Sequence, residues 1–351
     1  MTESNYRYLF NYNKAFLQQV LRFKTMTLLK ISGFVISKLQ LTKIVFSAIL
    51  YFFMLFSMEH AFASSESKNF NLVELASGIY VHYGKHVSFE SPDLDDIANI
   101  GFIVGDKCIA IIDTGGSVRI AQQLLSEIRR TSDKPVCYVI NTHIHFDHLL
   151  GNIVFKDTEA EFVGHQNLAD EIAANRSFFI REYGKNLGPQ VSEDSIIGPD
   201  ILVEEKMVLD LGNRKLQLNA YGAAHSHTDL TVFDEKTKTL WLSDLLFKER
   251  IPSLDGSLRG WLKSMDSFDR IDAEHIVPGH GPASTKSKDG YASQLQYLQL
   301  ILEETRRGIS QGLFMEDIVE QVGVNEKKKW LLHEQHHKRN VTKAFSELEW
   351  E

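Results

Sequence analysis

The segment Asn141-Thr142-His143-Ile144-His145-Phe146-Asp147-His148 is the most informative part of the chain. It directly follows residues 136–140, a short β-branched run without polar alternation, which predicts a strand buried on both faces. Loops at the ends of such strands are held by a rigid sheet and often bind ligands. In an extended backbone, residues two apart point the same way, so we expect His143, His145 and Asp147 to converge, while His148 turns toward a neighbouring position. Three imidazoles and one carboxylate so close together predict a metal site.

Three later segments, each at the edge of an expected strand, supply further candidate ligands. They are Gly222-Ala223-Ala224-His225-Ser226-His227-Thr228-Asp229, Trp241-Leu242-Ser243-Asp244-Leu245-Leu246-Phe247 and Pro278-Gly279-His280-Gly281-Pro282. Each segment alone is a weak signal. Together with the first cluster they give seven ligands, enough for two zinc ions: His143, His145, Asp147, His148, His225, Asp244 and His280.

The rest of the body alternates between strand-like and helix-like patterns. Strands or hairpins are predicted at residues 73–81, 102–112, 136–140, 161–164, 207–220 and 230–243, and helices at 120–128 and 166–183. After Pro282, Tyr291, Leu295, Leu298 and Leu302 keep helical spacing, and small helices are predicted at 313–322 and 330–332. This order indicates layers with sheet inside and helices outside. We expect a domain over residues 64–286 and a helical extension over 287–351 packed on the body.

The N-terminal end has the features of an export signal. Residues 44–58 form an uncharged apolar run, preceded by Lys38 and Lys43 and followed by Ala61-Phe62-Ala63. This arrangement predicts a signal peptide over residues 1–63, since the run is shorter than the roughly 20 residues that a spanning helix needs. Met26 would begin a leader of more ordinary length. The mature protein is expected in the periplasm without a stable membrane span; the alternative is an uncleaved anchor in the inner membrane.

Charge and cysteine content exclude several classes of protein. The chain of 351 residues has 38 Lys or Arg and 46 Asp or Glu, and only seven of those basic and two of those acidic residues lie in the first 63 positions. The strongly acidic body argues against nucleic-acid binding, which needs clustered basic groups. Two cysteines, Cys108 and Cys137, exclude a disulfide-rich scaffold and a four-cysteine zinc module. We expect both to be buried, inert thiols, although the sequence leaves open whether they oxidise together.

The ligand set, in this order, resembles the metallo-β-lactamase fold superfamily over about residues 69–283. The resemblance implies an α/β fold, the four-layer αβ/βα sandwich, with its site along one edge of two packed sheets. It implies that His143, His145 and His225 hold a first ion. Asp147, His148 and His280 would hold a second ion, and Asp244 would bridge the two. Asp113, in Ile112-Asp113-Thr114-Gly115-Gly116, would orient a ligand instead of binding metal.

Such a site permits metal-assisted hydrolysis. Zinc lowers the pKa of bound water from 15.7 to about 7, and two ions can stabilise both the nucleophile and the leaving group. We therefore expect a hydrolase in which the metal-activated water attacks an ester, lactone, thioester or amide of a small-molecule acyl substrate. Asp147 is the candidate catalytic residue, because it would help to orient the attacking water.

Two segments resemble a narrower group. The stretches at residues 243–261 and 340–351 are similar to the exported quinoprotein relay system zinc metallohydrolases, which are related to SoxH-type proteins. That resemblance implies a periplasmic quinoprotein dehydrogenase, dependent on pyrroloquinoline quinone, as a partner. It leaves two alternatives open. One is an iron-dependent protein of the same fold that handles persulfide or sulfur, and the other is a non-hydrolytic quinoprotein accessory.

Residues outside the ligand set are weaker candidates. Arg250, Asp255, Arg259 and Trp261 could form a rim for an anionic or acyl ligand, or belong to an ordinary loop that packs Trp261 into the body. His86 and His227, taken singly, are more typical of structural residues. A third set, His333, His336 and His337, lies among lysines and arginines, which favours a solvated polar face over a third metal site.

Overall fold

The computed structural model describes residues 29–31, 34–36, 70–189, 191–285 and 289–351. Leu29–Ile31 (β1) and Phe34–Ile36 (β2) form an antiparallel pair, and Phe70–Glu351 is a separate unit that holds all the other described elements. The predicted apolar run at residues 44–58 and the cleavage site that follows it lie outside the described residues. In the described part of the chain, no helix combines the length and the apolar character needed to cross a membrane.

The first sheet of the unit contains seven strands, each beside its neighbour in the chain. Pairing is antiparallel from β3 to β6 and parallel from β6 to β9. In β6, Ile109 and Ile111 face one apolar cluster while Ala110 and Ile112 face another, so the whole strand is buried. The strands are β3 Leu72–Ala76, β4 Ile79–His82, β5 Ile100–Val104, β6 Ile109–Ile112, β7 Val136–Ile140, β8 Glu161–His165 and β9 Ile201–Val203.

The second sheet contains six strands, again in chain order. Only β13 and β14 run parallel to each other. All nine residues of β13 are buried, which places this strand at the centre of the body. The strands are β10 Lys206–Asp210, β11 Lys215–Ala220, β12 Leu230–Asp234, β13 Thr239–Phe247, β14 His275–His280 and β15 Ser284–Thr285.

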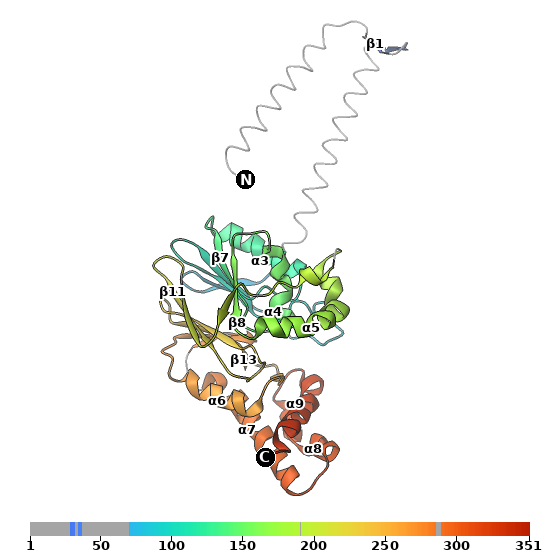
Figure 1. The fold of residues 1–351 in the computed structure, drawn as a ribbon, viewed down its shortest axis with the longest axis vertical. Helices are drawn as coiled ribbons and strands as arrows, with labels where there is room; N and C mark the ends of the chain where they lie inside the picture. The colour runs from blue at the N-terminus through green and yellow to red at the C-terminus, as the bar shows by residue number, and fades with distance from the viewer. Residues whose placement is uncertain (1–28, 32–33, 37–69, 190, 286–288) are drawn as a thin grey trace. The chain divides into compact units, whose positions relative to one another are not determined.

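Helices cover the outer faces of the two sheets (Figure 1). Ile103 and Ile112 of the first sheet pack with Leu218 and Trp241 of the second to form the central core. The helix α3 (Val118–Thr131) packs on the other side of the first sheet, and α6 (Leu258–Phe268) and α7 (Asp289–Ser310) pack on the other side of the second. The four layers confirm the predicted α/β sandwich. The remaining helical elements are α4 Phe146–Leu149, η3 Leu150–Phe155, α5 Leu168–Tyr183, η4 Gly184–Leu187, η5 Glu193–Ser195, α8 Met315–Gln321, η6 Val324–Lys328 and α9 His333–Leu348.

The C-terminal helix α9 holds the loop that joins β13 to α6. The Asn340 side chain donates to the carbonyl of Pro252 at 2.7 Å and accepts from the amide of Leu254 at 3.0 Å. The carboxylate of Glu347 accepts from the hydroxyl of Ser257, the residue that caps α6, at 2.7 Å. The conformation of this loop therefore depends on the C-terminal helices.

Residues 330–332 do not form the predicted helix. They connect η6 to α9, and the main chain of Leu331 pairs with the same loop. The amide of Ile251 donates to the carbonyl of Leu331 at 3.0 Å, and the amide of Leu331 donates to the carbonyl of Glu249 at 2.8 Å. This pairing requires an extended backbone, so the prediction of a small helix is wrong.

The expected solvated face at His333, His336 and His337 is also wrong, because all three side chains are buried. The two ring nitrogens of His337 contact the hydroxyl of Tyr297 and the carbonyl of Val322, at 3.0 and 2.8 Å. His333 stacks on His337 with ring centroids 4.3 Å apart, and its ring nitrogens form no hydrogen bond. Burial lowers the pKa of each of the three imidazoles.

Cys108 and Cys137 form a disulfide, so the expectation of two inert thiols is wrong. Cys108 directly precedes β6, and Cys137 belongs to β7, its parallel neighbour in the sheet. This adjacency brings the two Cα atoms to 5.8 Å, within the usual range for a disulfide. Strand adjacency cannot be read from the spacing of two cysteines alone.

The disulfide should add measurable stability. It joins residues 29 positions apart in the sequence. Chain entropy for a loop of that size predicts a loss of about 2–4 kcal/mol in the free energy of unfolding when the bond is absent. We expect guanidinium unfolding of the wild type to shift to lower denaturant on reduction. The unfolding midpoint of the Cys108→Ala/Cys137→Ala double variant should be the same with and without reductant. An equal shift of the midpoint in both proteins would contradict the prediction.

The buried imidazole of His333 should contribute to acid sensitivity. Burial lowers its pKa in the folded state, so below the unfolded value of about 6.5 the unfolded chain binds the proton more readily. Stability associated with this group is therefore complete above pH 6.5 and is lost as the pH falls. The substitution His333→Phe should make the decline in unfolding free energy between pH 7 and 5 shallower, by at most about 1.4 kcal/mol per pH unit. Parallel curves for the two proteins would refute this.

Candidate metal centre

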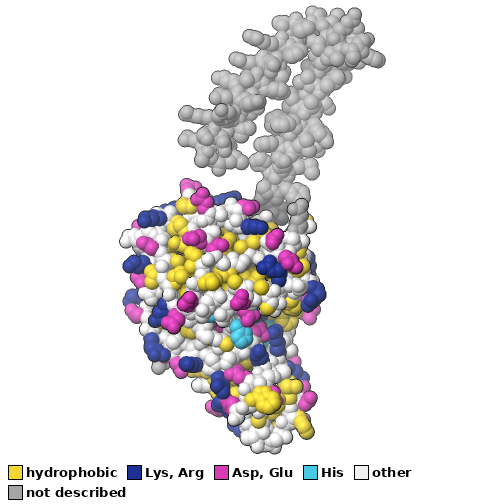
Figure 2. Space-filling view, viewed as in Figure 1, with side chains coloured by type: hydrophobic (Ala, Val, Ile, Leu, Met, Phe, Trp, Pro, Cys, Tyr) yellow, Lys and Arg dark blue, Asp and Glu magenta, His cyan; other side chains and the backbone are white. Residues whose placement is uncertain are grey.

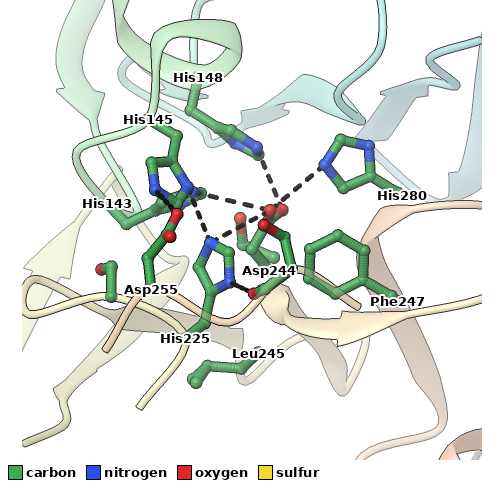
Figure 3. Close-up of polar contacts among 12 residues, drawn as sticks. His143, His145, His148, His225, Asp244, Leu245, Phe247, Asp255 and His280 are labelled. Carbon is green, nitrogen blue, oxygen red and sulfur yellow. Dashed lines mark hydrogen bonds and ion pairs between the residues drawn. The ribbon is translucent and has the colours of Figure 1, made fainter. Parts of the chain in front are cut away.

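The seven predicted ligands are brought together at one edge of the two sheets. Figure 3 labels six of them, all except Asp147. The loop after β7 carries His143 and His145, and α4 carries Asp147 and His148. The extended backbone assumed for this segment is thus wrong at Asp147, which reaches the site from a short helix. The other three ligands, His225, Asp244 and His280, belong to the loop before β12, to β13 and to the end of β14.

An irregularity in β13 aims Asp244 into the site. The pairing of β13 with β14 shifts register on both sides of Ser243, and Ser243 itself has a φ of 47°. A left-handed residue of this kind is uncommon outside glycine and marks a local constraint. Shifts of register at bulges re-aim side chains, so the carboxylate of the next residue points between the two ligand groups.

The first group comprises His143, His145, His225 and Asp244, whose potential ligand atoms lie within 4.8 Å of one another. The Nδ1 atom of His145 lies 3.1 Å from Nε2 of His143 and 2.9 Å from Nε2 of His225. Oδ2 of Asp244 is 3.8 and 3.4 Å from the same two Nε2 atoms. Three nitrogens and one carboxylate oxygen therefore face a common point.

The second group comprises Asp147, His148 and His280. Oδ2 of Asp147 lies 3.6 Å from Nε2 of His148 and 3.5 Å from Nε2 of His280. Asp244 reaches this group too, with Oδ1 at 3.1 Å from His148 Nε2 and Oδ2 at 3.2 Å from His280 Nε2. The carboxylate of Asp244 thus lies between the two groups, where a bridging ligand would be needed.

Hydrogen bonds orient four of the imidazoles with Nε2 toward the centre. The Nδ1 atom of His225 donates to the carbonyl of Ser253 at 2.7 Å, and that of His280 donates to the carbonyl of Ile97 at 2.6 Å. His148 and His143 make the equivalent bonds to Asp113 and Thr142. Protons on Nδ1 leave the Nε2 lone pairs free, as metal ligands require. Nε2 of His148 and Oδ1 of Asp244 are buried without hydrogen bonds, as expected of atoms that would bind a metal ion.

Asp113 supports ligands of both groups. Its carboxylate accepts from Nδ1 of His148 at 2.8 Å, and from the amide and hydroxyl of Thr142 at 2.8 and 2.7 Å. Since the Thr142 hydroxyl donates to Asp113, it is left to accept from Nδ1 of His143, 3.1 Å away. Asp113 therefore contacts ligands without facing the metal positions, and it has a left-handed φ of 57°.

The ring of His145 is oriented the other way round from the other four imidazoles. Its Nδ1 faces the first group, while Nε2 lies 2.9 Å from Oδ2 of Asp255. Asp255 in turn pairs with Arg339 of α9. The sequence predicts Asp255 only as part of a rim, because nothing in it places the 248–261 loop against His145, the second histidine of the motif.

Burial and mutual charge shift the pKa values of the ligands. Burial lowers the pKa of His143 well below its ordinary value and that of His225 to about 4. For His148, burial is outweighed by the carboxylates of Asp244 and Asp147, which raise its pKa well above the ordinary value. Burial would raise the pKa of Asp244, but the imidazoles of His280 and His148 hold it well below its usual range. The site is thus electrostatically suited to exchange protons for cations.

The other candidate residues separate into two sets. Arg250, Asp255 and the exposed His227 line a cavity of about 470 Å³ beside the ligands, whereas Arg259 and Trp261 do not. Arg259 forms ion pairs with Glu347 and Glu351 near the C-terminus, and Trp261 is fully buried in α6. His86 lies 3.6 Å from Glu249. On the face shown in Figure 2, histidine side chains reach the surface with acidic and basic side chains nearby.

Two curated relatives have names that describe hydrolases, one an alkylsulfatase and the other a probable metallo-hydrolase. The chain is 23% identical over 253 residues to the linear primary-alkylsulfatase of a Pseudomonas species, covering 61% of this chain and 48% of that one. It therefore spans about half the length of that relative. It is also 24% identical over 217 residues to a probable metallo-hydrolase of Methanocaldococcus jannaschii, covering 56% of this chain and 93% of the other.

Solved structures share the fold. A metallo-beta-lactamase from Pontibacter korlensis has a TM-score of 0.54 at 20% identity, with 66% of this chain and 99% of that chain covered. The stereoselective inverting sec-alkylsulfatase Pisa1 of a Pseudomonas species has a TM-score of 0.61 at 17% identity, with 80% and 50% covered.

The sequence profile of the metallo-beta-lactamase superfamily matches residues 94–280, more than half of the chain and the part that carries all seven candidate ligands. The chain therefore belongs to the metallo-beta-lactamase superfamily.

Proposed function

We propose that this protein is a hydrolase that holds two zinc ions and cleaves its substrate with activated water. The observation that carries the proposal is the position of Asp244, whose two carboxylate oxygens reach ligands of both groups at 3.1–3.4 Å. Imidazole and carboxylate are ligands that suit zinc, and a bridging carboxylate suits a pair of ions. His143, His145 and His225 would hold one ion, and Asp147, His148 and His280 the other.

Zinc ions bound there would activate water at neutral pH and stabilise negative charge that develops on the substrate. The chain itself supplies orientation. Asp147 belongs to the second group and also lines the cavity, which supports the proposal that its carboxylate holds and orients the attacking water. Asp113, through His148 and Thr142, keeps ring protons on Nδ1 and thereby keeps the lone pairs directed inward.

We propose an ester, lactone, thioester or amide as the bond cleaved. Fold and ligand set favour hydrolysis in general, and they do not distinguish among leaving groups. A sulfate ester is a second candidate, favoured by the 253-residue likeness to a linear primary-alkylsulfatase. A matched panel of an ester, a lactone, a thioester, an amide and an alkyl sulfate would separate the two.

We also propose that the protein works outside the cytoplasm as an accessory of a quinoprotein dehydrogenase. The Cys108–Cys137 disulfide supports export, because disulfides persist in oxidising compartments. The partner rests on the resemblance of the stretches at 243–261 and 340–351 to quinoprotein relay hydrolases. These two stretches also contact each other, since Asn340 and Glu347 bind the loop at 252–257.

Asp147→Asn should abolish turnover of whichever panel substrate is cleaved while leaving the fold intact. Loss of an orienting carboxylate predicts a decrease in kcat of about 10²- to 10⁴-fold. Thermal unfolding checks the fold, and Asp170→Asn, an exposed aspartate of α5, serves as the matched control. Activity that survives in Asp147→Asn would exclude this mechanism.

Asp113→Asn should weaken metal binding. The wild type is expected to bind two zinc ions per chain, and loss of a carboxylate that orients a ligand typically costs about 10- to 100-fold in affinity. Zinc titration against a competing chelator measures both quantities. Asp106→Asn, at an exposed position next to β6, should bind as the wild type does. One ion or none in the wild type would argue against the dinuclear site.

A further inference from the structure

The cavity beside the metal centre has one wall that the superfamily match does not include. The helix α9 contributes His336, Arg339 and Lys343 to the lining, and all three lie beyond residue 280, where the match ends. The lining also includes candidate ligands, among them Asp147 and His280. The C-terminal extension is therefore positioned to contact whatever binds next to the ligands.

A buried arginine without a carboxylate partner lies where this wall meets the centre. The side chain of Arg250 lines the cavity and is only 5% exposed. Among the described residues, no carboxylate lies within ion-pair distance of it, and its Nε forms no hydrogen bond. One terminal nitrogen is 3.1 Å from His280 Nδ1, which already donates to the carbonyl of Ile97 and so cannot also accept. The Cζ atom of Arg250 lies 5.8 Å from the centroid of the Phe247 ring, which compensates part of the cost of burial. A buried guanidinium without a directly bonded counter-ion is still costly, so this position suits an anion.

His336 offers a second unused donor. Its Nε2 lies 3.3 Å from the other terminal nitrogen of Arg250. Because arginine can only donate, Nε2 must accept, and the ring proton must be on Nδ1. That Nδ1 is buried and has no hydrogen-bond partner. Two buried N–H groups, on neighbouring residues of one cavity wall, thus lack acceptors.

The surrounding charges favour an anion once metal is bound. Arg339 is paired with Asp255, and Lys343 has no ion pair in the described part of the chain. Apart from the ligands Asp147 and Asp244 and the paired Asp255, Glu171 is the acidic residue in the cavity lining. Two divalent ions would outweigh the carboxylates of Asp147 and Asp244, leaving the wall next to them positive.

Apolar side chains indicate what accompanies the anion. Phe89 and Phe178 line the same cavity and are 46% and 44% exposed, and Phe89 packs against the ring of His336 with centroids 5.1 Å apart. Partly exposed aromatic rings beside a polar subsite suit a ligand with an apolar body.

We propose that Arg250 and His336 form a subsite for an oxyanion carried by the substrate, a carboxylate or a sulfate, with Lys343 at its edge. The substrate is then an amphiphile whose apolar part lies along Phe89 and Phe178. This inference rests on the proposed function for the identity of the ligand as a substrate, while the binding itself does not require turnover.

Isothermal titration of the full chain at pH 8 tests the subsite, with and without zinc. The probes are 4-phenylbutyrate, 3-phenylpropyl sulfate and the uncharged 4-phenylbutanamide. We expect the zinc-loaded chain to bind at least one anionic probe about tenfold more tightly than the amide, since hydrogen bonds to charged groups are worth about 1.5–3 kcal/mol. The stronger of the two anions identifies the oxyanion.

His336→Phe should remove most of that preference, and Arg250→Met should remove all of it. His333→Phe is the matched control, because it makes the same change one turn earlier in α9, at a residue that does not line the cavity. Lys343→Met, compared with the exposed Lys338→Met, gives a second pair if His336→Phe does not fold.

Equal binding of amide and anions, or wild-type binding by the fully folded subsite variants, would overturn the proposal. Its failure is distinguishable from that of the hydrolase function. Selective anion binding with no turnover of any panel substrate leaves the subsite standing and removes the hydrolase. Turnover of a panel substrate together with equal binding of anions and amide would keep the hydrolase and remove the subsite.

Discussion

The carboxylate of Asp113 is the interaction on which the rest of the site depends. It is buried at the end of β6 and accepts hydrogen bonds from His148 and from Thr142, and through Thr142 it also fixes His143. One side chain therefore sets the direction of a ring in each ligand group. A buried anion is tolerable there because both of its oxygens accept hydrogen bonds. The left-handed backbone at this residue is the local strain that accompanies that placement.

Both sheets contribute ligands to the candidate centre. The first sheet supplies a compact motif whose members lie within six positions, whereas the second supplies ligands from three separate segments. Asn99 joins the halves, since its amide nitrogen donates to the carbonyls of Pro278 and Gly281 on either side of His280. Because the ligands come from both sheets, their spacing depends on sheet packing, which the central core holds.

Much of this could be predicted from the sequence, for identifiable reasons. The candidate ligands lie at or near strand ends. Ligands in a short motif can be identified from residue type and spacing alone, without the tertiary structure. The carbonyls of Ile97 and Ser253, which orient His280 and His225, could not be found, because backbone atoms have no residue signature. Burial of His336 depends on α9 folding across the loop after β13. The disulfide depends on which strands are neighbours, and the sequence does not state this.

The Cys108–Cys137 bond lies at the far end of the strands that carry the metal motif. β6 leads from Cys108 to Asp113, and β7 leads from Cys137 to the loop of His143. Oxidation therefore fastens together the two strands whose other ends position the rings. Through this covalent link, a bond that forms only under oxidising conditions braces the strands behind a candidate centre whose own ligands are all histidine and aspartate.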